Sequence, residues 1–509
     1  MTQPNPPAYV QILKRERKRA LINSMSGLLG WDERTYLPGK GIPLRSDQLA
    51  LLACMSHDLL CDPKLLELLA QAEIELKLAD ADDPRRANLK GIRRQVQRAQ
   101  KLPAELVEAM ARATTVGQQA WEAAKKANCY ADFAPALQKI LQLKREEAQA
   151  VGIGQHPYDS LLDEYEPGMT VQELEVIFKS LKTELVAFIG NVVAAKKKHK
   201  PSASASRILE RAFPVDRQKI LCQTVAASIG FDFNAGRLDE TAHPFCSGQG
   251  PGDVRLTTRY NERYFNEAFF GTLHEAGHGL YEQNLPSEHY GTPLGQACSL
   301  GMHESQSRLW ENQVGRSMPF WDYYYPIVQA IFPESLGDVA KPTFFAAIND
   351  VQPSLIRIEA DEVTYNLHIL LRFELELALI TGELSVQDLP AAWNEKFKAY
   401  FQITPENDAL GCLQDIHWSA GLFGYFPTYT LGNLYAAQFM VKAKGDLADL
   451  NQRLSQGHFR LLTDWLQHNI HAHGQRYSAK ELGLKVTGSP LSQHAFMHYL
   501  REKYETLYA

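Results

Sequence analysis

The sequence predicts a mainly α-helical protein with a small β-sheet near its middle. Two observations lead to this fold class. Long stretches on both sides of the middle place apolar residues at helical spacing among charged and amide side chains. Residues 240–265 instead combine glycine and proline with β-branched and aromatic residues, which is typical of short strands and turns. The 509 residues, 45% of them hydrophobic, are enough to bury a large core.

The elements follow from local patterns along the chain. Residues 8–30 have the periodicity of a helix, which a Pro- and Gly-rich segment ends. Residues 44–150 carry several amphipathic patterns and predict helical hairpins. A Lys-rich then Ser-rich stretch at 194–206 predicts a surface connector, its charge run being a solvated helix end.

The second half begins with the predicted sheet. One or two short strands are expected between Val254 and Tyr260, and the pattern is mainly helical from residue 266 onward. No internal repeat or low-complexity tract interrupts the chain. We interpret residues 1–509 as a single domain, with an N-terminal helical portion (1–200) and a second, catalytic portion (207–509).

Composition excludes several classes of protein. Lysine and arginine (53) are outnumbered by aspartate and glutamate (59), so the net charge of −6 argues against a nucleic-acid partner. The longest mostly apolar run, residues 185–195, is too short to span a membrane, and the first residues lack the apolar core of a signal peptide. Seven scattered cysteines without a CxxC motif fit reduced thiols. These observations predict a cytoplasmic protein.

The segment HEAGH carries the clearest chemistry in the sequence. His274 and His278 lie four residues apart, so they project from one face of a helix and can bind one zinc ion. Glu275 follows the first histidine and can act as a general base toward a metal-activated water, as in zincins. Gly277 and Gly279 weaken a helix, which indicates that another backbone or a substrate approaches closely there.

A catalytic zinc ion needs a third protein ligand and one open position. The downstream segment 302–313 offers three candidates, His303, Glu304 and Glu311. Glu304 lies 26 residues after His278, a spacing that suits a helix, a turn and a second helix. The alternative interpretation makes Glu304 a surface carboxylate paired with Arg308 one turn later.

Two other histidine groups compete with this site. His494 and His498 are also four residues apart, with Glu502 one turn further, but no glutamate follows His494 to act as a base. We interpret them as a plain helix face. A second group is more typical of a polar helix end stopped by Gly474 than of a metal site. That group comprises His468, His471 and His473.

Eight segments together resemble the carboxypeptidase Taq family of thermostable zinc metallocarboxypeptidases. They span nearly the whole chain, and each stands in the order expected for that family. In chain order they are WDERTYLP (31–38), YEPGMT (165–170), DVRLT (253–257), HEAGHGLYEQ (274–283), HESQS (303–307), IRIEAD (356–361), GCLQDIHW (411–418) and GYFPTYTLGN (424–433). Several such motifs in register are far more specific than HExxH alone.

The resemblance implies an elongated, mostly helical zincin-type body with a deep active-site groove, usually a cytoplasmic homodimer. It implies an enzyme that releases single C-terminal residues from peptides, with broad side-chain tolerance and poor tolerance of proline. Zinc is the expected metal, one ion per chain, and cobalt can substitute. The ligands carried over by motif are His274, His278 and Glu304, with Glu275 as the base.

A carboxypeptidase must also recognise a free C-terminal carboxylate, which a guanidinium does well. Arg357 is the leading candidate, followed by Arg255 and His417; the alternative for each arginine is a structural ion pair. Asp253 is expected to hold Arg255, and Asp361 to hold Arg357 or to orient a zinc-bound imidazole.

Other motif residues receive weaker predictions. The oxyanion of the tetrahedral intermediate needs a donor besides zinc, and His417 and Tyr425 are the candidates. Gln414 is expected to line the substrate groove and Asp415 to support the site, whereas Trp418 is expected to pack in the core.

Two alternative functions remain at this point. A zinc endo-oligopeptidase with a similar helical groove has the same HExxH motif and downstream glutamate, and the IRIEAD and GCLQDIHW segments favour the carboxypeptidase. An inactive, peptide-binding or chaperone-like relative would not need the intact set of His274, Glu275, His278 and Glu304.

Overall fold

The computed structural model describes residues 5–80, 82–199 and 207–508, and it confirms the mainly α-helical prediction. The helices of the first half are α1 (Pro7–Thr35), α2 (Ile42–Cys61), α3 (Pro63–Glu75), α4 (Pro84–Lys101), α5 (Ala104–Ala127), α6 (Tyr130–Val151), α7 (Pro157–Tyr165) and α8 (Val171–His199). Helix α8 continues to His199, so the Lys-rich run begins at a helix end as expected, and the Ser-rich remainder of the connector lies outside the described residues.

The second half begins with a helix and the sheet and is helical thereafter. Its larger elements are α10 (Val215–Ile229), β1 (Gly236–Glu240), β2 (Cys246–Gly250), β3 (Asp253–Thr258), α11 (Phe265–Asn284), α12 (Leu300–Arg308), a π-helical turn (Leu309–Val314), α13 (Met318–Ile331), α14 (Pro333–Leu336), α15 (Lys341–Ile348), α16 (Tyr365–Thr381), α17 (Leu389–Phe401), α18 (Pro427–Asp446), α19 (Leu450–Ser455), α20 (Arg460–Asn469), α21 (Ala479–Thr487) and α22 (His494–Leu507). Short 3-10 turns lie at Gly39–Gly41, Arg207–Glu210, Ser287–His289, Pro293–Gly295, Arg357–Glu359 and His471–Arg476.

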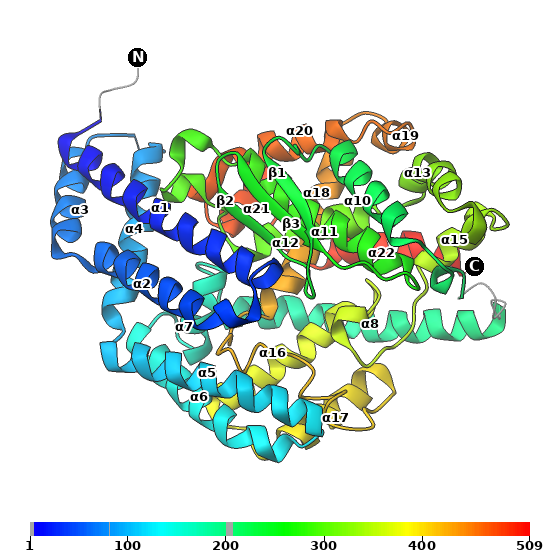
Figure 1. The fold of residues 1–509 in the computed structure, drawn as a ribbon, viewed down its shortest axis with the longest axis horizontal. Helices are drawn as coiled ribbons and strands as arrows, with labels where there is room; N and C mark the ends of the chain where they lie inside the picture. Colours follow the sequence, from blue (N-terminus) through cyan, green and yellow to red (C-terminus); the bar gives the residue numbers. More distant parts are fainter. Residues whose placement is uncertain (1–4, 81, 200–206, 509) are drawn as a thin grey trace.

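The three strands form one sheet in the order β1-β3-β2. Strand β1 pairs parallel to β3, and β2 pairs antiparallel to it. Strand β3 corresponds to the predicted strand, whereas β1 and β2 were not predicted individually. Figure 1 shows the sheet lying over α11, and the buried Val254 and Leu256 of β3 point into the main core.

Two hydrophobic clusters organise the packing. The smaller cluster belongs to α1, α3 and α4, where Ile12, Leu69 and Ile92 are fully buried. The larger cluster includes residues of α5 to α8 together with the second half of the chain. Figure 1 shows α1 to α4 in blue along one side of the molecule. The division of the single domain near residue 200 stays an interpretation.

The seven cysteines are free thiols in the structure. Among the described residues, no helix has the length and apolar content needed to cross a membrane.

Candidate metal centre and catalytic groove

Helix α11 carries the HEAGH segment and packs against α12. A Cβ atom at Gly277 would lie 2.5 Å from the backbone oxygen of Gln306, so only glycine allows the two helices to approach this closely. At Gly279, a Cβ atom would meet the Leu256 and Phe231 side chains at 2.7 and 2.8 Å. The expected close approach is therefore found at both glycines, with a backbone at the first and side chains at the second.

The close packing brings three potential metal ligands together. One ligand atom each of His274, His278 and Glu304 lies within 4.8 Å of the others. The Oε2 atom of Glu304 is 3.7 Å from Nε2 of His274 and 3.3 Å from Nε2 of His278. Tetrahedral bonds of about 2.0 to 2.1 Å separate zinc ligands by roughly 3.3 Å, so two nitrogens and one oxygen fit zinc with one position left open.

The carboxylate of Glu304 is buried, so the interpretation as a surface residue is wrong. The pairing with Arg308 is nevertheless present, because Nε of Arg308 donates to Oε1 of Glu304 at 2.7 Å. The hydroxyl of Ser307 donates to Oε2 at 3.1 Å. Burial raises the pKa of Glu304, but Arg308 and the two imidazoles outweigh burial and hold it well below its usual value. The carboxylate is thus ionised and oriented.

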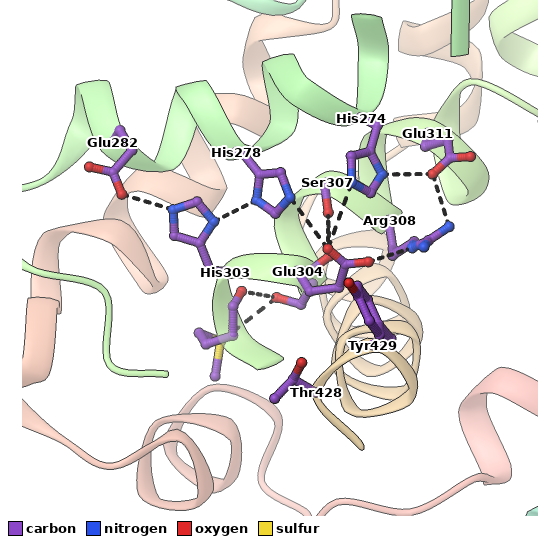
Figure 2. Close-up of polar contacts among 12 residues, drawn as sticks. His274, His278, Glu282, His303, Glu304, Ser307, Arg308, Glu311, Thr428 and Tyr429 are labelled. Atoms are coloured by element: carbon purple, nitrogen blue, oxygen red, sulfur yellow. Dashed lines mark hydrogen bonds and ion pairs between the residues drawn. The ribbon is translucent and has the colours of Figure 1, made fainter. Parts of the chain in front are cut away.

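Glu311 has the supporting role that the sequence analysis considered for Asp361. Its Oε2 lies 2.8 Å from Nδ1 of His274 and 3.2 Å from Nη1 of Arg308 (Figure 2). Asp361 instead accepts hydrogen bonds from the backbone of Gln352, Val363 and Thr364, just before α16. Its position explains why it contacts neither Arg357 nor a histidine.

A different chain of contacts supports His278. Figure 2 shows Nδ1 of His278 facing Nδ1 of His303, whose Nε2 lies 2.8 Å from Oε1 of Glu282. His303, a candidate ligand by sequence, therefore contacts the Nδ1 side of the His278 imidazole, whereas Glu304 faces its Nε2 side. Burial, followed by the His303 charge, lowers the pKa of His278 to about 3, so its imidazole is neutral, as metal binding requires.

Glu275 is buried next to the three potential ligands. Burial raises its pKa to about 7, and the charges of Glu304 and Glu311 add to this effect while His274 opposes it. A carboxyl group with a pKa near neutrality can both accept and return a proton. This property suits the predicted role of a general base.

A second buried charge cluster surrounds the IRIEAD and GCLQDIHW segments. Asp415 accepts from Nε of Arg357 at 2.9 Å through Oδ1 and from Nε of Arg372 at 2.7 Å through Oδ2. The backbone nitrogen of Arg357 also donates to Oε1 of Gln414 at 2.9 Å. Asp415, rather than Asp361, therefore holds Arg357, and Gln414 fixes the loop that carries it.

One carboxylate shared by two guanidinium groups leaves an excess positive charge in this cluster. Burial lowers the pKa values of both Arg357 and Arg372, but the Asp415 charge raises that of Arg357 above its usual value while that of Arg372 stays lowered. Arg372 is fully buried on α16 and was not singled out by the sequence. Its only signal was its place on a largely apolar helix, a pattern that does not identify its partner.

Tyr365 joins the two clusters. Its hydroxyl accepts from Nη1 of Arg357 at 3.1 Å, and the guanidinium of Arg308 lies 4.2 Å from the centre of its ring. The Arg357–Asp415–Arg372 cluster therefore lies one aromatic ring away from the Arg308–Glu304 pair.

The candidate oxyanion donors lie beside this junction. Nε2 of His417 is 3.1 Å from the hydroxyl of Tyr429, which Figure 2 places next to Glu304. Burial, together with the Arg357 charge, lowers the pKa of His417 to about 3, and burial raises that of Tyr425 to about 12. His417 is thus neutral and Tyr425 protonated at neutral pH. Tyr429 was missed because only the fold brings it close to Glu304.

Arg255 and Asp253 form the expected ion pair on β3. Nε of Arg255 donates to Oδ1 of Asp253 at 2.8 Å and Nη2 to Oδ2 at 2.9 Å. The guanidinium also lies 4.4 Å from the ring centre of Trp31 on α1. These contacts correspond to the structural alternative considered for Arg255.

The competing histidine groups have the following surroundings. His494 and His498 are exposed on α22, which supports the interpretation as a plain helix face. His471 is buried, and its Nε2 lies 2.9 Å from Oε1 of Gln306, a contact that the sequence did not predict. Gly474 adopts a positive φ of 50° in the turn that follows α20.

A cavity of about 440 Å³ has His303 in its wall, and none of the three potential metal ligands lines it. His303 contributes to its wall together with Arg98 of α4 and Tyr165 of α7. The cavity therefore lies between the first helices of the chain and the start of α12.

Comparisons with known proteins agree with this geometry. A family model described as Carboxypeptidase Taq (M32) metallopeptidase matches residues 11–504. Thermostable carboxypeptidase 1 of Thermus thermophilus is 45% identical over 510 residues, which cover 98% of this chain and 99% of that protein. Carboxypeptidase 1 of Bacillus subtilis is 38% identical over 481 residues, covering 94% and 95% of the two chains.

Solved structures show the same relationship. The crystal structure of the M32 carboxypeptidase from Deinococcus radiodurans R1 superposes with a TM-score of 0.94 at 36% identity, covering 99% of this chain and 100% of that one. The Trypanosoma cruzi metallocarboxypeptidase 1 structure gives a TM-score of 0.93 at 36% identity and covers 98% and 99%. The chain therefore belongs to the carboxypeptidase Taq (M32) family of metallopeptidases, and it is a peptide hydrolase of the metallocarboxypeptidase class.

Proposed function

We propose that the protein releases single C-terminal residues from peptides, with broad side-chain tolerance and poor tolerance of proline, by means of zinc held by His274, His278 and Glu304. The observation that carries the proposal is the proximity of two unlike clusters. A set of nitrogen and oxygen ligands suited to a cation lies one aromatic ring from an arginine cluster suited to a carboxylate. The specificity rests on the family resemblance alone.

The metal supplies two effects when bound, because it lowers the pKa of a water molecule and polarises the scissile carbonyl. The residues of the chain perform the remaining steps. Glu275 accepts a proton from the attacking water at a carboxylate oxygen and delivers it to the nitrogen of the leaving amino acid. Its buried position and raised pKa support this exchange.

Arg357 is proposed to bind the C-terminal carboxylate of the substrate. The excess positive charge shared by Arg357 and Arg372 over Asp415 supports this role, because a substrate carboxylate neutralises it. Hydroxyl donors for the developing oxyanion come from Tyr425 and Tyr429, which are protonated at neutral pH, and neutral His417 can donate one ring N–H. Arg255, already paired with Asp253, is less suited to bind substrate.

The test uses a short peptide with a free C-terminus and the same peptide with an amidated C-terminus. The purified protein is treated with a chelator, supplied again with Zn²⁺ or Co²⁺, and its products are followed by mass spectrometry. We expect stepwise loss of single residues from the free peptide only, in both metal-restored samples and not in the chelated one. Cleavage of both peptides at internal bonds would instead identify an endo-oligopeptidase.

Two variants make the assignment specific. Glu275→Gln keeps the shape of the side chain and removes the base, so turnover is expected to fall at least about 100-fold. His498→Ala changes an exposed histidine on α22 and serves as the control, with unchanged turnover. Wild-type turnover by Glu275→Gln would overturn the assignment of Glu275 as the general base.

A cytoplasmic homodimer is proposed from the same resemblance. Exposed apolar side chains on α1 and α2, including Leu21, Met25, Leu44 and Leu51, support the presence of a contact surface. Sedimentation equilibrium of the full chain measures the state directly, and a single monomeric species at micromolar concentration contradicts the proposal.

A further inference from the structure

We propose that His303 and Glu282 form a positioning relay that orients the His278 imidazole and thereby sets the affinity of the site for its metal. The inference rests on the proposed ligand set of His274, His278 and Glu304. It concerns residues outside that set and assigns each of them a hydrogen-bonding state.

The two histidine ligands receive different support in the structure. Nδ1 of His274 faces the carboxylate of Glu311 directly. Nδ1 of His278 faces a second imidazole, that of His303, and the carboxylate of Glu282 comes only after it (Figure 2). Histidines that bind metals usually donate their free N–H to a carboxylate, a backbone carbonyl or water, so an imidazole in this place needs its own explanation.

The protons of the relay follow from the geometry. His278 presents Nε2 to Glu304, and a metal bound there takes the lone pair of Nε2 and leaves the proton on Nδ1. That Nδ1–H must donate to Nδ1 of His303, which is therefore the acceptor. With Nδ1 of His303 as the acceptor, the ring N–H of His303 is on Nε2, from which it donates to Oε1 of Glu282. Glu282 thus fixes the tautomer of His303, and His303 fixes that of His278.

Surrounding residues hold the relay in place. The ring of His303 stacks on Tyr281, with ring centres 5.3 Å apart and planes at 29°, and Tyr281 stacks on buried His471 in the same way at 4.8 Å. Glu282 lies against β2, where a Cβ atom at Gly248 would be 2.4 Å from its Oε2. Strand β2 therefore leaves space for the Glu282 carboxylate, and the sheet is linked to the metal site through it.

The relay is tested by metal affinity rather than by turnover. Zn²⁺ dissociation constants are measured by competition with a chromogenic chelator, and the visible absorption of the Co²⁺-loaded protein reports the geometry of the ligands. We expect His303→Leu to weaken Zn²⁺ binding about 10- to 100-fold and to change the Co²⁺ spectrum. His303→Asn keeps an acceptor near His278 but loses Glu282, so its affinity should be intermediate.

Glu282→Gln is the second, milder variant, because it removes the charge that fixes the His303 tautomer with little change in volume. We expect a smaller loss of affinity than for His303→Leu, with unchanged thermal unfolding of the metal-free protein. Unchanged unfolding separates the relay from a structural role, which would lower the unfolding temperature and leave the dissociation constant unchanged. If His303→Leu fails to fold, His303→Asn and Glu282→Gln carry the test.

Two controls distinguish the failure of this inference from failure of the proposed ligand set. Exposed His498→Leu should bind Zn²⁺ with wild-type affinity, and His278→Ala should lose it. Wild-type affinity in His278→Ala would overturn the ligand set itself. Loss of binding in His278→Ala together with wild-type affinity in His303→Leu and Glu282→Gln would leave the ligand set intact and overturn the relay.

Discussion

The two buried charge clusters around Tyr365 have opposite compositions. In the first, Glu275, Glu304 and Glu311 outnumber the cations Arg308 and Arg316. In the second, Arg357 and Arg372 share the single carboxylate of Asp415. Buried charges are normally paired, so the composition of each cluster supports its proposed partner. The first is suited to a metal cation and the second to a carboxylate.

The largest effect is expected from a change in the carboxylate-rich cluster. Glu304→Gln removes the charge of a proposed ligand, so Zn²⁺ affinity should fall sharply and kcat/KM by about 1000-fold. Chelator competition and peptide hydrolysis measure the two quantities. Wild-type metal affinity in this variant would contradict the proposal that the carboxylate-rich cluster binds the metal.

The corresponding change in the arginine-rich cluster should weaken substrate binding and leave metal binding unchanged. Arg357→Gln removes the group that is proposed to bind a substrate carboxylate, so kcat/KM should fall by about 100-fold, or about 3 kcal/mol, mainly through KM. Zn²⁺ affinity should stay at the wild-type value, because Arg357 touches no proposed ligand. Arg357→Lys keeps the charge without the bidentate geometry, so its kcat/KM should lie between that of the wild type and that of Arg357→Gln. An equal loss of metal affinity would show that the clusters are not separate.

Asp415 tests the internal balance of the second cluster. Asp415→Asn leaves two buried guanidinium groups without a carboxylate, so the free energy of unfolding should fall by about 3 to 5 kcal/mol. Urea unfolding monitored by circular dichroism measures the change. A variant as stable as the wild type would mean that solvent already compensates these arginines, and the excess charge would no longer explain substrate binding.

Glu376 provides a carboxylate that no guanidinium accompanies. It accepts hydrogen bonds from Tyr158, Trp418 and the backbone of Gly424, while burial raises its pKa from 4.5 to about 7. The contact also confirms Trp418 as a core residue. Because the folded-state pKa lies above the unfolded value, the folded form binds more protons between these pH values. Stability from this group is therefore complete below pH 4.5 and is lost as the pH rises to about 7.

The expected loss is roughly 3 kcal/mol across that range. Glu376→Gln removes the titration, so its free energy of unfolding should change less between pH 4.5 and 8 than that of the wild type. Subtracting the two profiles isolates Glu376 from other buried carboxyls. Parallel profiles would show that its pKa is ordinary and that hydrogen bonds alone stabilise the charged form.

The sequence predicts those parts of the molecule that depend on local periodicity. The placement of His274, Glu275 and His278 on one helix follows from spacing alone, as does the helical character of both halves. Strands β1 and β2 were missed because GRLDE and CSGQG contain few β-branched residues and depend on pairing with β3.

Contacts between segments far apart in the sequence could not be predicted from local patterns. The sequence offers Asp361, four residues away, as one possible partner of Arg357, whereas the structure pairs Arg357 with Asp415, 58 residues away. Asp361 is occupied by the backbone of its own turn, a local preference of aspartate that competes with distant partners. Arg372 and Tyr429 entered the site only through the packing of α16 and α18.

The π-helical turn after α12 has a consequence for how the protein tolerates change. Such a turn spans one more residue than an α-helical turn, so the residues that follow it are rotated relative to those before it. Upstream, Arg308 faces Glu304; downstream, Arg316 lies 3.8 Å from the ring centre of Phe270. A one-residue deletion that restored regular α-helical spacing would rotate Arg316 relative to Arg308, so this segment should tolerate changes of length poorly.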